Sequence, residues 1–489
     1  MSLAHKAARG ALWTVASSIG GRAVGVLGTL IMTRFLHPDI IGEVSDAAIL
    51  CWTASWLTIW GFGQYSVVKG RGADRQEVVW HATVFYWVLG AISLGLVVLF
   101  GGRLTPLLNA PHAAVYIPGM AISIFIRRMG AMPERILTQK MNFRPSGVAL
   151  AVGEMVYTVV ALSFAAMGYG GMSIVIANIV QSTIVVTILI NAAGIRSWAT
   201  PTPLRLARIK DMLRYGMPLG LQGIAHNASR YWDNLAVSHF FGAGATGAYN
   251  MAYNLADIPA IQVGEQIALV LLPSMAELPP ERRANALERS TALLSIIIFP
   301  LAVGLGLIAY PLIAAILPAN QWQEVAPLLT VLACLSVFRP ITWVLSAYME
   351  SEGKTNRLMF LEVAKVGLLL GGIALLSPYG LRTAAFAVGL AFGATAIAGV
   401  AMVVREGPSP GKLFIGFLQP LVACAAMGAA VFGVYRLLLW GGIRHPLVYL
   451  LVEIVVGAIA YVIAALIICR DTSKDLIGLL GKALRKSPA

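Results

Sequence analysis

Charged residues are scarce in this chain. Only 12% of its 489 residues are Asp, Glu, Lys or Arg, about half the share of a typical soluble domain, whereas 58% are hydrophobic. A soluble domain of this length would need more polar surface than this composition supplies. The apolar excess must therefore face lipid, and we expect an integral membrane protein.

Cysteine is also rare, and long polar loops are missing. The four cysteines lie within or at the end of apolar runs, without the spacing of a metal site and without a disulfide framework: Cys51, Cys334, Cys424 and Cys469. No polar stretch between apolar runs is long enough to fold as a separate domain. We therefore expect no bound metal, no cofactor and no catalytic domain outside the membrane.

The opening residues predict a retained membrane anchor. Lys6 and Arg9 precede an apolar run that is too long for the hydrophobic region of a signal peptide, and no small-residue cleavage motif follows it.

Apolar runs long enough to cross a bilayer, about 20 residues each, recur along the whole chain. The sequence therefore predicts an all-α polytopic membrane protein of fourteen transmembrane helices, near residues 11–33, 40–62, 78–100, 113–130, 147–167, 170–195, 213–239, 247–273, 290–313, 323–349, 358–377, 381–404, 412–440 and 446–468.

The positions of Lys and Arg predict the orientation, because these residues gather on the cytoplasmic side of bacterial membranes. With the N-terminus inside, 25 of the 36 Lys and Arg fall in the tails and even-numbered loops, and seven fall in spans. The other four lie in the opposite loops: Arg34, Arg103, Arg382 and Arg444. We therefore predict a bacterial inner-membrane protein with both termini in the cytoplasm. Its net charge of +14 then reflects topology, so we expect no nucleic acid partner.

A weak internal repeat divides the chain into halves. The segment TRFLHPDIIGEV (33–44) aligns with SHFFGAGATGAY (238–249) at an offset of 205 residues, and Gly42 matches Gly247. Both segments hold the periplasmic turn between the first two helices of a half. Six spans is an even number, so the halves form a parallel repeat with the substrate site expected at their interface. We predict six-helix lobes at 1–195 and 213–404, two extra helices at 405–468 and a basic cytoplasmic tail at 469–489.

A basic linker at 196–212 joins the predicted lobes. Leu206, Ile209 and Leu213 fall on one helical face, whereas Arg205, Arg208 and Lys210 lie elsewhere around it. The segment predicts either a short amphipathic helix along the cytoplasmic surface or a solvated linker.

Two segments and the arrangement of spans carry a family resemblance. The segments are ALWTVASSIGGRAVGVLGTLIMTRFLHPDIIGEVSDA (11–47) and MLRYGMPLGLQGIA (212–225). With the 6 + 6 + 2 pattern of helices, the chain resembles the oligosaccharide flippases (Wzx type) of the multidrug/oligosaccharidyl-lipid/polysaccharide exporter superfamily. The resemblance implies that a polyprenyl-pyrophosphate-linked oligosaccharide, a repeat unit of O-antigen lipopolysaccharide or exopolysaccharide, moves from the cytoplasmic to the periplasmic leaflet by alternating access. It also implies contacts with membrane lipids and with the polysaccharide polymerase and chain-length machinery.

The candidate site residues are the ionisable residues inside the predicted spans. Placing one such side chain in the membrane without a partner costs at least ~2.5–3.5 kcal/mol, so each needs a partner or a polar cavity. Arg22 and Arg339 have no acid three or four residues away on their helices, and they are candidates for the substrate's pyrophosphate. The alternative to a substrate contact is that Arg22 forms a structural ion pair with Asp46 or Glu43. Arg127 and Arg128 end span four, where they either snorkel to the interface or join the substrate contacts.

Other buried charges predict local pairs or a coupling ion. Arg230 precedes Asp233 by three residues and Glu362 precedes Lys365 by three, so we expect both to be ion pairs along one helix. A buried acid could instead bind a coupling H⁺ or Na⁺. Asp46, Asp233 and Asp257 are the candidates, and the sequence does not choose among them.

Two rival functions fit the sequence less well. A cation-coupled multidrug exporter of the same superfamily is expected to have twelve spans and an acidic first helix, whereas this chain has fourteen predicted spans and Arg22. A polysaccharide polymerase or ligase needs catalytic residues on a sizeable external loop. The longest predicted periplasmic loop, 101–112, has no acid pair and no nucleophile with a base. We therefore predict a transporter and no enzyme activity.

Overall fold

The computed structural model of the protein describes residues 20, 24–69, 74–140, 142–259, 275, 278–318, 321–405, 407–442 and 445–485. This part of the chain is helical and contains no β-strand, which confirms the predicted all-α class. It divides into two compact units, residues 1–247 and 248–489. The helix α9 (Leu206–Pro259) crosses this boundary.

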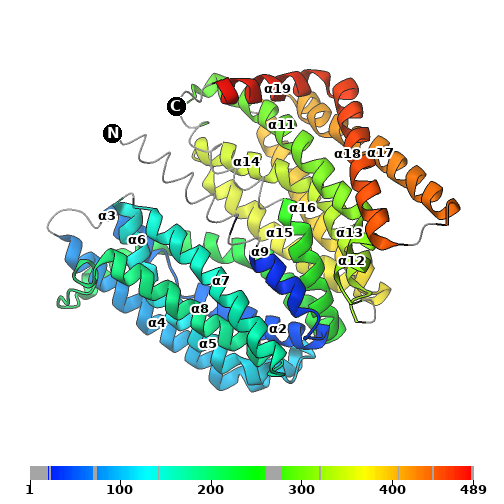
Figure 1. Ribbon diagram of the computed structural model, residues 1–489. Coiled ribbons are helices and arrows are strands. Elements are labelled where there is room, and N and C mark those ends of the chain that lie inside the picture. Colours follow the sequence, from blue (N-terminus) through cyan, green and yellow to red (C-terminus); the bar gives the residue numbers. More distant parts are fainter. Residues whose placement is uncertain are drawn as a thin grey trace. The chain divides into compact units, whose positions relative to one another are not determined.

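Unit 1 is a bundle of long helices joined by short turns (Figure 1). Its helices are α2 (Pro38–Trp56), α3 (Phe62–Lys69), α4 (Arg75–Leu104), α5 (Ala113–Met129), α6 (Ala131–Gln139), α7 (Arg144–Ala166), α8 (Met172–Ala193) and the first part of α9, with 3-10 turns η2 (Thr105–Leu108) and η3 (Ile195–Ser197). Short α3 and α6 were not predicted.

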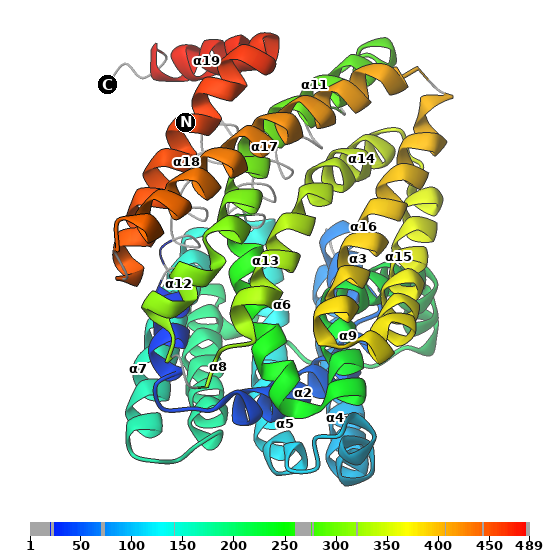
Figure 2. The same cartoon turned by 90° about the vertical axis from the view of Figure 1, so that its right-hand side faces the viewer.

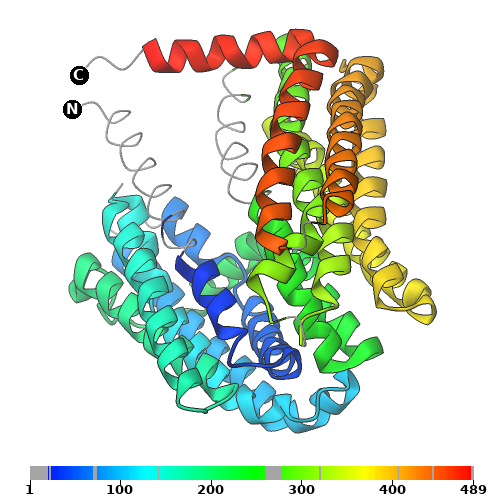
Figure 3. The same cartoon turned by 45° about the vertical axis from the view of Figure 1, so that its right-hand side comes forward.

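Unit 2 contains the rest of the helices, with the pair α15 and α16 and the pair α17 and α18 each lying side by side (Figure 2). They are α11 (Pro280–Leu307), α12 (Ala309–Ile316), α13 (Val325–Leu335), η5 (Ser336–Phe338), α14 (Arg339–Ser351), α15 (Thr355–Leu376), η6 (Ser377–Tyr379), α16 (Leu381–Val404), α17 (Pro410–Trp440), α18 (Pro446–Ile468) and α19 (Arg470–Arg485). The predicted basic tail is thus mostly helix α19, which crosses the end of α18 (Figure 3).

Nine helices in the described part of the chain are long and apolar enough to cross a membrane. They match predicted spans three, five, six and nine to fourteen. Three further predicted spans, two, four and seven, coincide with α2, α5 and the first part of α9, and the second part of α9, to Pro259, covers the described start of span eight. Helix α2 carries three carboxylates, and α5 has only 17 residues. The first predicted span is described as helix from residue 24 to 32. The protein is therefore a multi-pass membrane protein compatible with fourteen spans.

Helix α9 joins three predicted elements into one. It starts at Leu206 inside the basic linker, so the amphipathic segment forms its first turns and is no separate helix. Gly242 then interrupts it with φ 82° and ψ 176°, a backbone conformation open to glycine, at the turn predicted between spans seven and eight.

The ion pairs near the helix ends connect segments that are predicted to lie on the same side of the membrane. In unit 1, Arg208 pairs with Asp74 (2.9 Å) and Glu77 (3.5 Å), which joins two loops predicted to be cytoplasmic. In unit 2, Arg283 pairs with Glu352 at 2.8 Å, again between two predicted cytoplasmic segments. Similar pairs connect Lys412 with Glu288 and Arg289 with Asp475. Opposite them, Arg382 pairs with Glu324 at 3.5 Å between two predicted periplasmic turns.

The two segments of the internal repeat lie directly against each other in unit 1. Gly42 packs on the carbonyl group of Ala243, and Gly247 packs on the carbonyl group of Pro38. Ala243 is the repeat equivalent of Pro38, and Gly247 that of Gly42, so the two contacts are related by exchange of the repeats. A reciprocal contact of this kind is what a two-fold relationship between the predicted repeats would produce. At both positions a Cβ atom would overlap the facing carbonyl oxygen.

Candidate functional site

The site in unit 2 is built at a break in predicted span ten. Helix α13 ends at Leu335, a 3-10 turn follows, and α14 starts at Arg339 with Pro340 in its first turn. Proline is favoured there because the first helical N–H groups have no intrahelical acceptor. The break places the Arg339 guanidinium at a helix N-terminus, where the helix dipole disfavours a positive charge. A nearby anion is therefore required.

Asp257 supplies that anion. The guanidinium of Arg339, only 8% exposed, forms an ion pair with the buried carboxylate of Asp257 on α9. It also donates a hydrogen bond to the Tyr253 hydroxyl at 3.1 Å and lies 5.3 Å from the centre of that ring. Arg339 and Asp257 were predicted separately as a substrate contact and a coupling-ion site, and the structure brings them together. Tyr253, one helical turn before Asp257, was missed.

A second ion pair, in which the cation is buried, lies next to the first. Lys365 and Glu362 of α15 form the predicted ion pair at 2.7 Å, which is confirmed. The Lys365 ammonium is 5.0 Å from the centre of the Phe392 ring on α16, and the Arg339 guanidinium is 5.2 Å from the same centre. Phe392 is therefore an aromatic platform shared by two buried cations. It was also missed, because a lone phenylalanine in an apolar run carries no signal.

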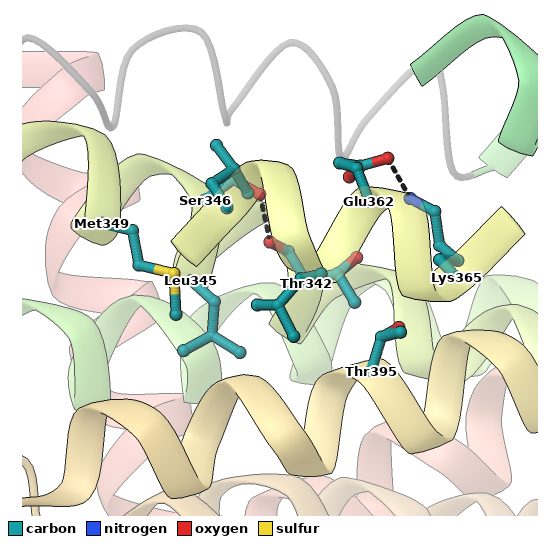
Figure 4. Close-up of a pocket in the computed structure, with 9 residues that line it drawn as sticks. Thr342, Leu345, Ser346, Met349, Glu362, Lys365 and Thr395 are labelled. Atoms are coloured by element: carbon teal, nitrogen blue, oxygen red, sulfur yellow. Dashed lines mark hydrogen bonds and ion pairs between the residues drawn. The ribbon is translucent and has the colours of Figure 1, made fainter. Parts of the chain in front are cut away.

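A small pocket of about 20 Å³ with a mixed polar and apolar lining opens beside Lys365, with Glu362 and Lys365 facing each other on one side (Figure 4). The opposite side comes from α14, where Thr342 and Ser346 lie one turn apart, and from Thr395 of α16. The Ser346 hydroxyl donates to the Thr342 carbonyl at 2.9 Å. Hydroxyl groups and a charged pair inside an apolar bundle can bind a polar ligand group.

Arg128 is bound entirely by protein groups. Its guanidinium, in a side chain 6% exposed, donates to the carbonyls of Tyr86 (2.5 Å), Ser55 (2.8 Å) and Thr58 (3.0 Å) and to the Ser55 hydroxyl (3.0 Å). Two of these carbonyls lie at the C-terminal end of α2, where a cation is favoured. Its neighbour Arg127 is half-buried, and the Arg127 side chain has no hydrogen bond or ion pair among the described residues.

The other two candidate acids lie in unit 1. Asp46 of α2 is fully buried and its carboxyl group is hydrogen-bonded to the Ser238 hydroxyl of α9, while its Oδ1 atom has no hydrogen-bond partner in the described structure. Asp233 is also buried and accepts hydrogen bonds from the backbone and side-chain amides of Asn234 at 2.9 and 3.1 Å. The expected pair of Arg230 with Asp233 stays a prediction.

Arg22 lies outside the described residues, so its predicted roles remain predictions. No group of three or more His, Cys, Asp or Glu that could hold a metal ion occurs in the described part of the chain.

Comparison with known proteins identifies the family. A profile described as polysaccharide biosynthesis protein matches residues 31–327. The chain belongs to this family.

Relatives within the polysaccharide biosynthesis family match most of the chain. It is 24% identical over 491 residues to the succinoglycan biosynthesis transport protein ExoT of Rhizobium meliloti (strain 1021), covering 98% of this chain and 96% of the relative. It is 21% identical to the lipopolysaccharide biosynthesis protein WzxC of Escherichia coli (strain K12), covering 77% and 76%.

Two solved structures show the same fold. The lipid II flippase MurJ in an inward closed conformation matches with a TM-score of 0.75 at 14% identity, over 94% of this chain and 99% of MurJ. An inward-facing multidrug resistance MATE transporter of the MOP superfamily matches with a TM-score of 0.66 at 15% identity, over 80% and 98%. This member of the polysaccharide biosynthesis family therefore has the fold of the MOP superfamily, as predicted.

Proposed function

We propose that the protein flips a polyprenyl-pyrophosphate-linked oligosaccharide, a repeat unit of O-antigen or exopolysaccharide, from the cytoplasmic to the periplasmic leaflet. Membership of the polysaccharide biosynthesis family, the transport role in the name of the relative from Rhizobium meliloti and the fold shared with MurJ support this proposal. Two six-helix lobes, 1–195 and 213–404, alternate the access, and no bond is made or broken in the lipid-linked substrate.

The observation that carries the proposal is the double ion pair around Phe392. Two buried cations, each with its own carboxylate, are electrically balanced while the site is empty, which avoids the penalty of an uncompensated buried charge. A pyrophosphate that enters can take the place of a carboxylate on Arg339, because a guanidinium gives two parallel hydrogen bonds to phosphate oxygens. A paired site thus suits an anion that must bind and then leave.

The other candidate residues also have roles in this proposal. Arg22 and Arg127 are further contacts for the pyrophosphate, and Arg128, which is already satisfied by protein carbonyls, stabilises the helices that carry Arg127. Asp46, Asp233 and Asp257 are the candidate sites for a coupling H⁺ or Na⁺. Lipids surround the protein, and a polysaccharide polymerase with its chain-length machinery receives the product.

Deletion of the gene tests the function. We expect synthesis of the lipid-linked oligosaccharide to continue while the product accumulates in the cytoplasmic leaflet. Leaflet position is measured by access of a glycan-modifying enzyme or lectin to intact and lysed spheroplasts. If the glycan reached the periplasm but stayed unpolymerised or unligated, the protein would be a polymerase or ligase. Normal glycan with increased sensitivity to cationic drugs would instead indicate a multidrug exporter.

The proposed orientation places both termini in the cytoplasm of the inner membrane. In a cysteine-free background, single cysteines at Gly102 and Tyr169 should react with an impermeant thiol reagent added to intact spheroplasts. Cysteines at Lys140 and Asn285 should react only after lysis. All four positions are exposed in the structure, so a difference in labelling reports sidedness rather than burial. The reversed pattern would overturn the orientation.

A further inference from the structure

Asp46 lies in a hydrogen-bonded cluster at the predicted periplasmic end of unit 1. The cluster joins α2, the turn η2 and the end of the first part of α9. The Ser238 hydroxyl of α9 contacts both the Asp46 carboxyl group and, at 2.7 Å, the carbonyl oxygen of Leu108. Two more hydrogen bonds fasten the same end of α9 to η2: His239 Nδ1 to the Leu107 carbonyl and Asn109 Nδ2 to the His239 carbonyl, both at 2.5 Å.

The hydrogens in this cluster can be counted. A serine hydroxyl has one hydrogen to donate, and a carbonyl oxygen can only accept. If Ser238 donates to Leu108, its contact with Asp46 needs a hydrogen on the carboxyl group. If Ser238 donates to Asp46 instead, the Ser238 and Leu108 oxygens face each other at 2.7 Å with no hydrogen between them. Each contact has a hydrogen of its own only when Asp46 is a neutral carboxylic acid.

The surroundings of Asp46 agree with the neutral form. Its side chain is 0% exposed, its Oδ1 atom has no hydrogen-bond partner, and no cation forms an ion pair with it among the described residues. A buried carboxylate without a compensating charge would be costly. A sodium ion fits less well than a proton, because hard cations take several oxygen ligands and, among the described residues, only the Ser238 hydroxyl forms a hydrogen bond with the Asp46 carboxyl group.

Acidic residues lead from the surface to this position. Asp39, Glu43 and Asp46 are spaced by four and three residues, so they lie on one face of α2. Asp39 is exposed, Glu43 is half-buried and Asp46 is fully buried. Among the described residues, the other titratable groups near this row include His112 and Tyr116, which lie close to Glu43, and His239, whose ring is bound to η2. The row can relay a proton between the predicted periplasmic surface and Asp46.

We propose that Asp46 is the proton-binding site of this transporter and that its proton fastens the periplasmic end of α9 to α2 and η2. This inference rests on the proposed function and selects one of its three candidate acids. Loss of the proton leaves a buried negative charge and removes one of the two hydrogen bonds at Ser238. The periplasmic end of α9 is then released from α2 and η2, which links proton transfer to a movement within unit 1.

The first test needs no substrate. Infrared difference spectra of the purified full-length protein, recorded during a pH titration, should contain the carbonyl band of a buried carboxylic acid. Asp46→Asn should remove this band, whereas Ser238→Ala should shift it by removing a hydrogen bond. Asp257→Asn is the matched control, because Asp257 is an ion-paired carboxylate, and it should leave the band unchanged. A neutral-pH spectrum in which Asp46→Asn removes only a carboxylate band would overturn the proposal.

The second test measures coupling. In proteoliposomes containing the lipid-linked oligosaccharide, a proton gradient should drive transport and a sodium gradient should not. Asp46→Asn, whose amide can replace the donated hydrogen, should lower the response to the proton gradient by about tenfold, within the range of known coupling free energies. A sodium-driven response, or an unchanged proton response in Asp46→Asn, would contradict the proposal. If Asp46→Asn reduced abundance and Arg22→Ala restored it, Asp46 would be a structural partner of Arg22. An Asp46 acid band without any lipid transport would refute the proposed function alone.

Discussion

Replacing Arg339 with alanine is expected to lower oligosaccharide flipping by about 100-fold, the equivalent of two lost charge-assisted hydrogen bonds. The guanidinium is buried, fixed over Phe392 and bound to Asp257, so nothing else in the described part of unit 2 can take its place on that ring except Lys365. Arg339→Lys should recover only part of the activity, because it restores the charge without the planar pair of donors. Leaflet access of the glycan, normalised to protein in the membrane, is the measurement.

The Asp257 pair requires a control, because removal of one partner leaves the other charge buried at a cost of about 3–5 kcal/mol. Arg339→Ala alone is therefore expected to reduce abundance as well as flipping. The double variant Arg339→Ala/Asp257→Ala removes both charges and should restore abundance but not flipping. If the double variant flipped normally, the pair would have only a structural role.

Substitutions at two other arginines serve as comparisons for Arg339→Ala. Arg128→Ala should reduce abundance, because four hydrogen bonds to three residues of unit 1 are lost, and no second substitution on an acid should rescue it. Arg382→Ala should change neither quantity, since Arg382 is 59% exposed and its contact with Glu324 is long at 3.5 Å.

The membrane helices could be predicted because span length is fixed by the bilayer. An apolar run of about 20 residues has few alternatives to a helix. Short helices lack this constraint: α3 and α6 lie in turns, where neither length nor hydrophobicity marks them. The linker was predicted to be separate from span seven because its composition changes there, but backbone hydrogen bonds continue through a change of composition. Gly242 shows the opposite case, since its left-handed backbone falls where the turn was predicted.

The candidate site was predictable only along single helices. Spacing of three residues identified Lys365 with Glu362, because such neighbours share a helix face. The same rule could not find the partner of Arg339, because Asp257 lies 82 residues away on another helix. Pairs between helices depend on packing, which no periodicity in the sequence records.

Larger side chains at Gly42 or Gly247 are expected to have an effect as large as loss of Arg339. A Cβ atom at Gly42 would overlap the carbonyl oxygen of Ala243, and one at Gly247 would overlap the carbonyl oxygen of Pro38. Backbone atoms cannot rotate away as side chains can, so Gly42→Val or Gly247→Val must push α2 and α9 apart. The close contact next to Asp46 and Ser238 would be lost, and we expect flipping to fall to background.

Accessibility of a buried alanine measures this separation directly. Ala110 is 0% exposed and packs in a small cluster with Ala243, so a cysteine at position 110 should be protected from an impermeant thiol reagent. It should become reactive when Gly42→Val or Gly247→Val is added. Gly95→Val is the matched control, because nothing lies within 4 Å of its Cβ position, and it should leave position 110 protected.

The repeat predicts more than the loss of activity at each glycine. Because the two contacts are related by exchange of the repeats, Gly42→Val and Gly247→Val should expose position 110 to a similar extent. The double variant should expose it no further, since either substitution alone already separates the same pair of helices, and such neighbouring effects do not add. Independent, additive effects would mean that the two glycines act at separate contacts. A silent Gly247→Val beside a damaging Gly42→Val would mean that only the first hairpin needs the close approach, and that the two-fold relationship has no role in transport.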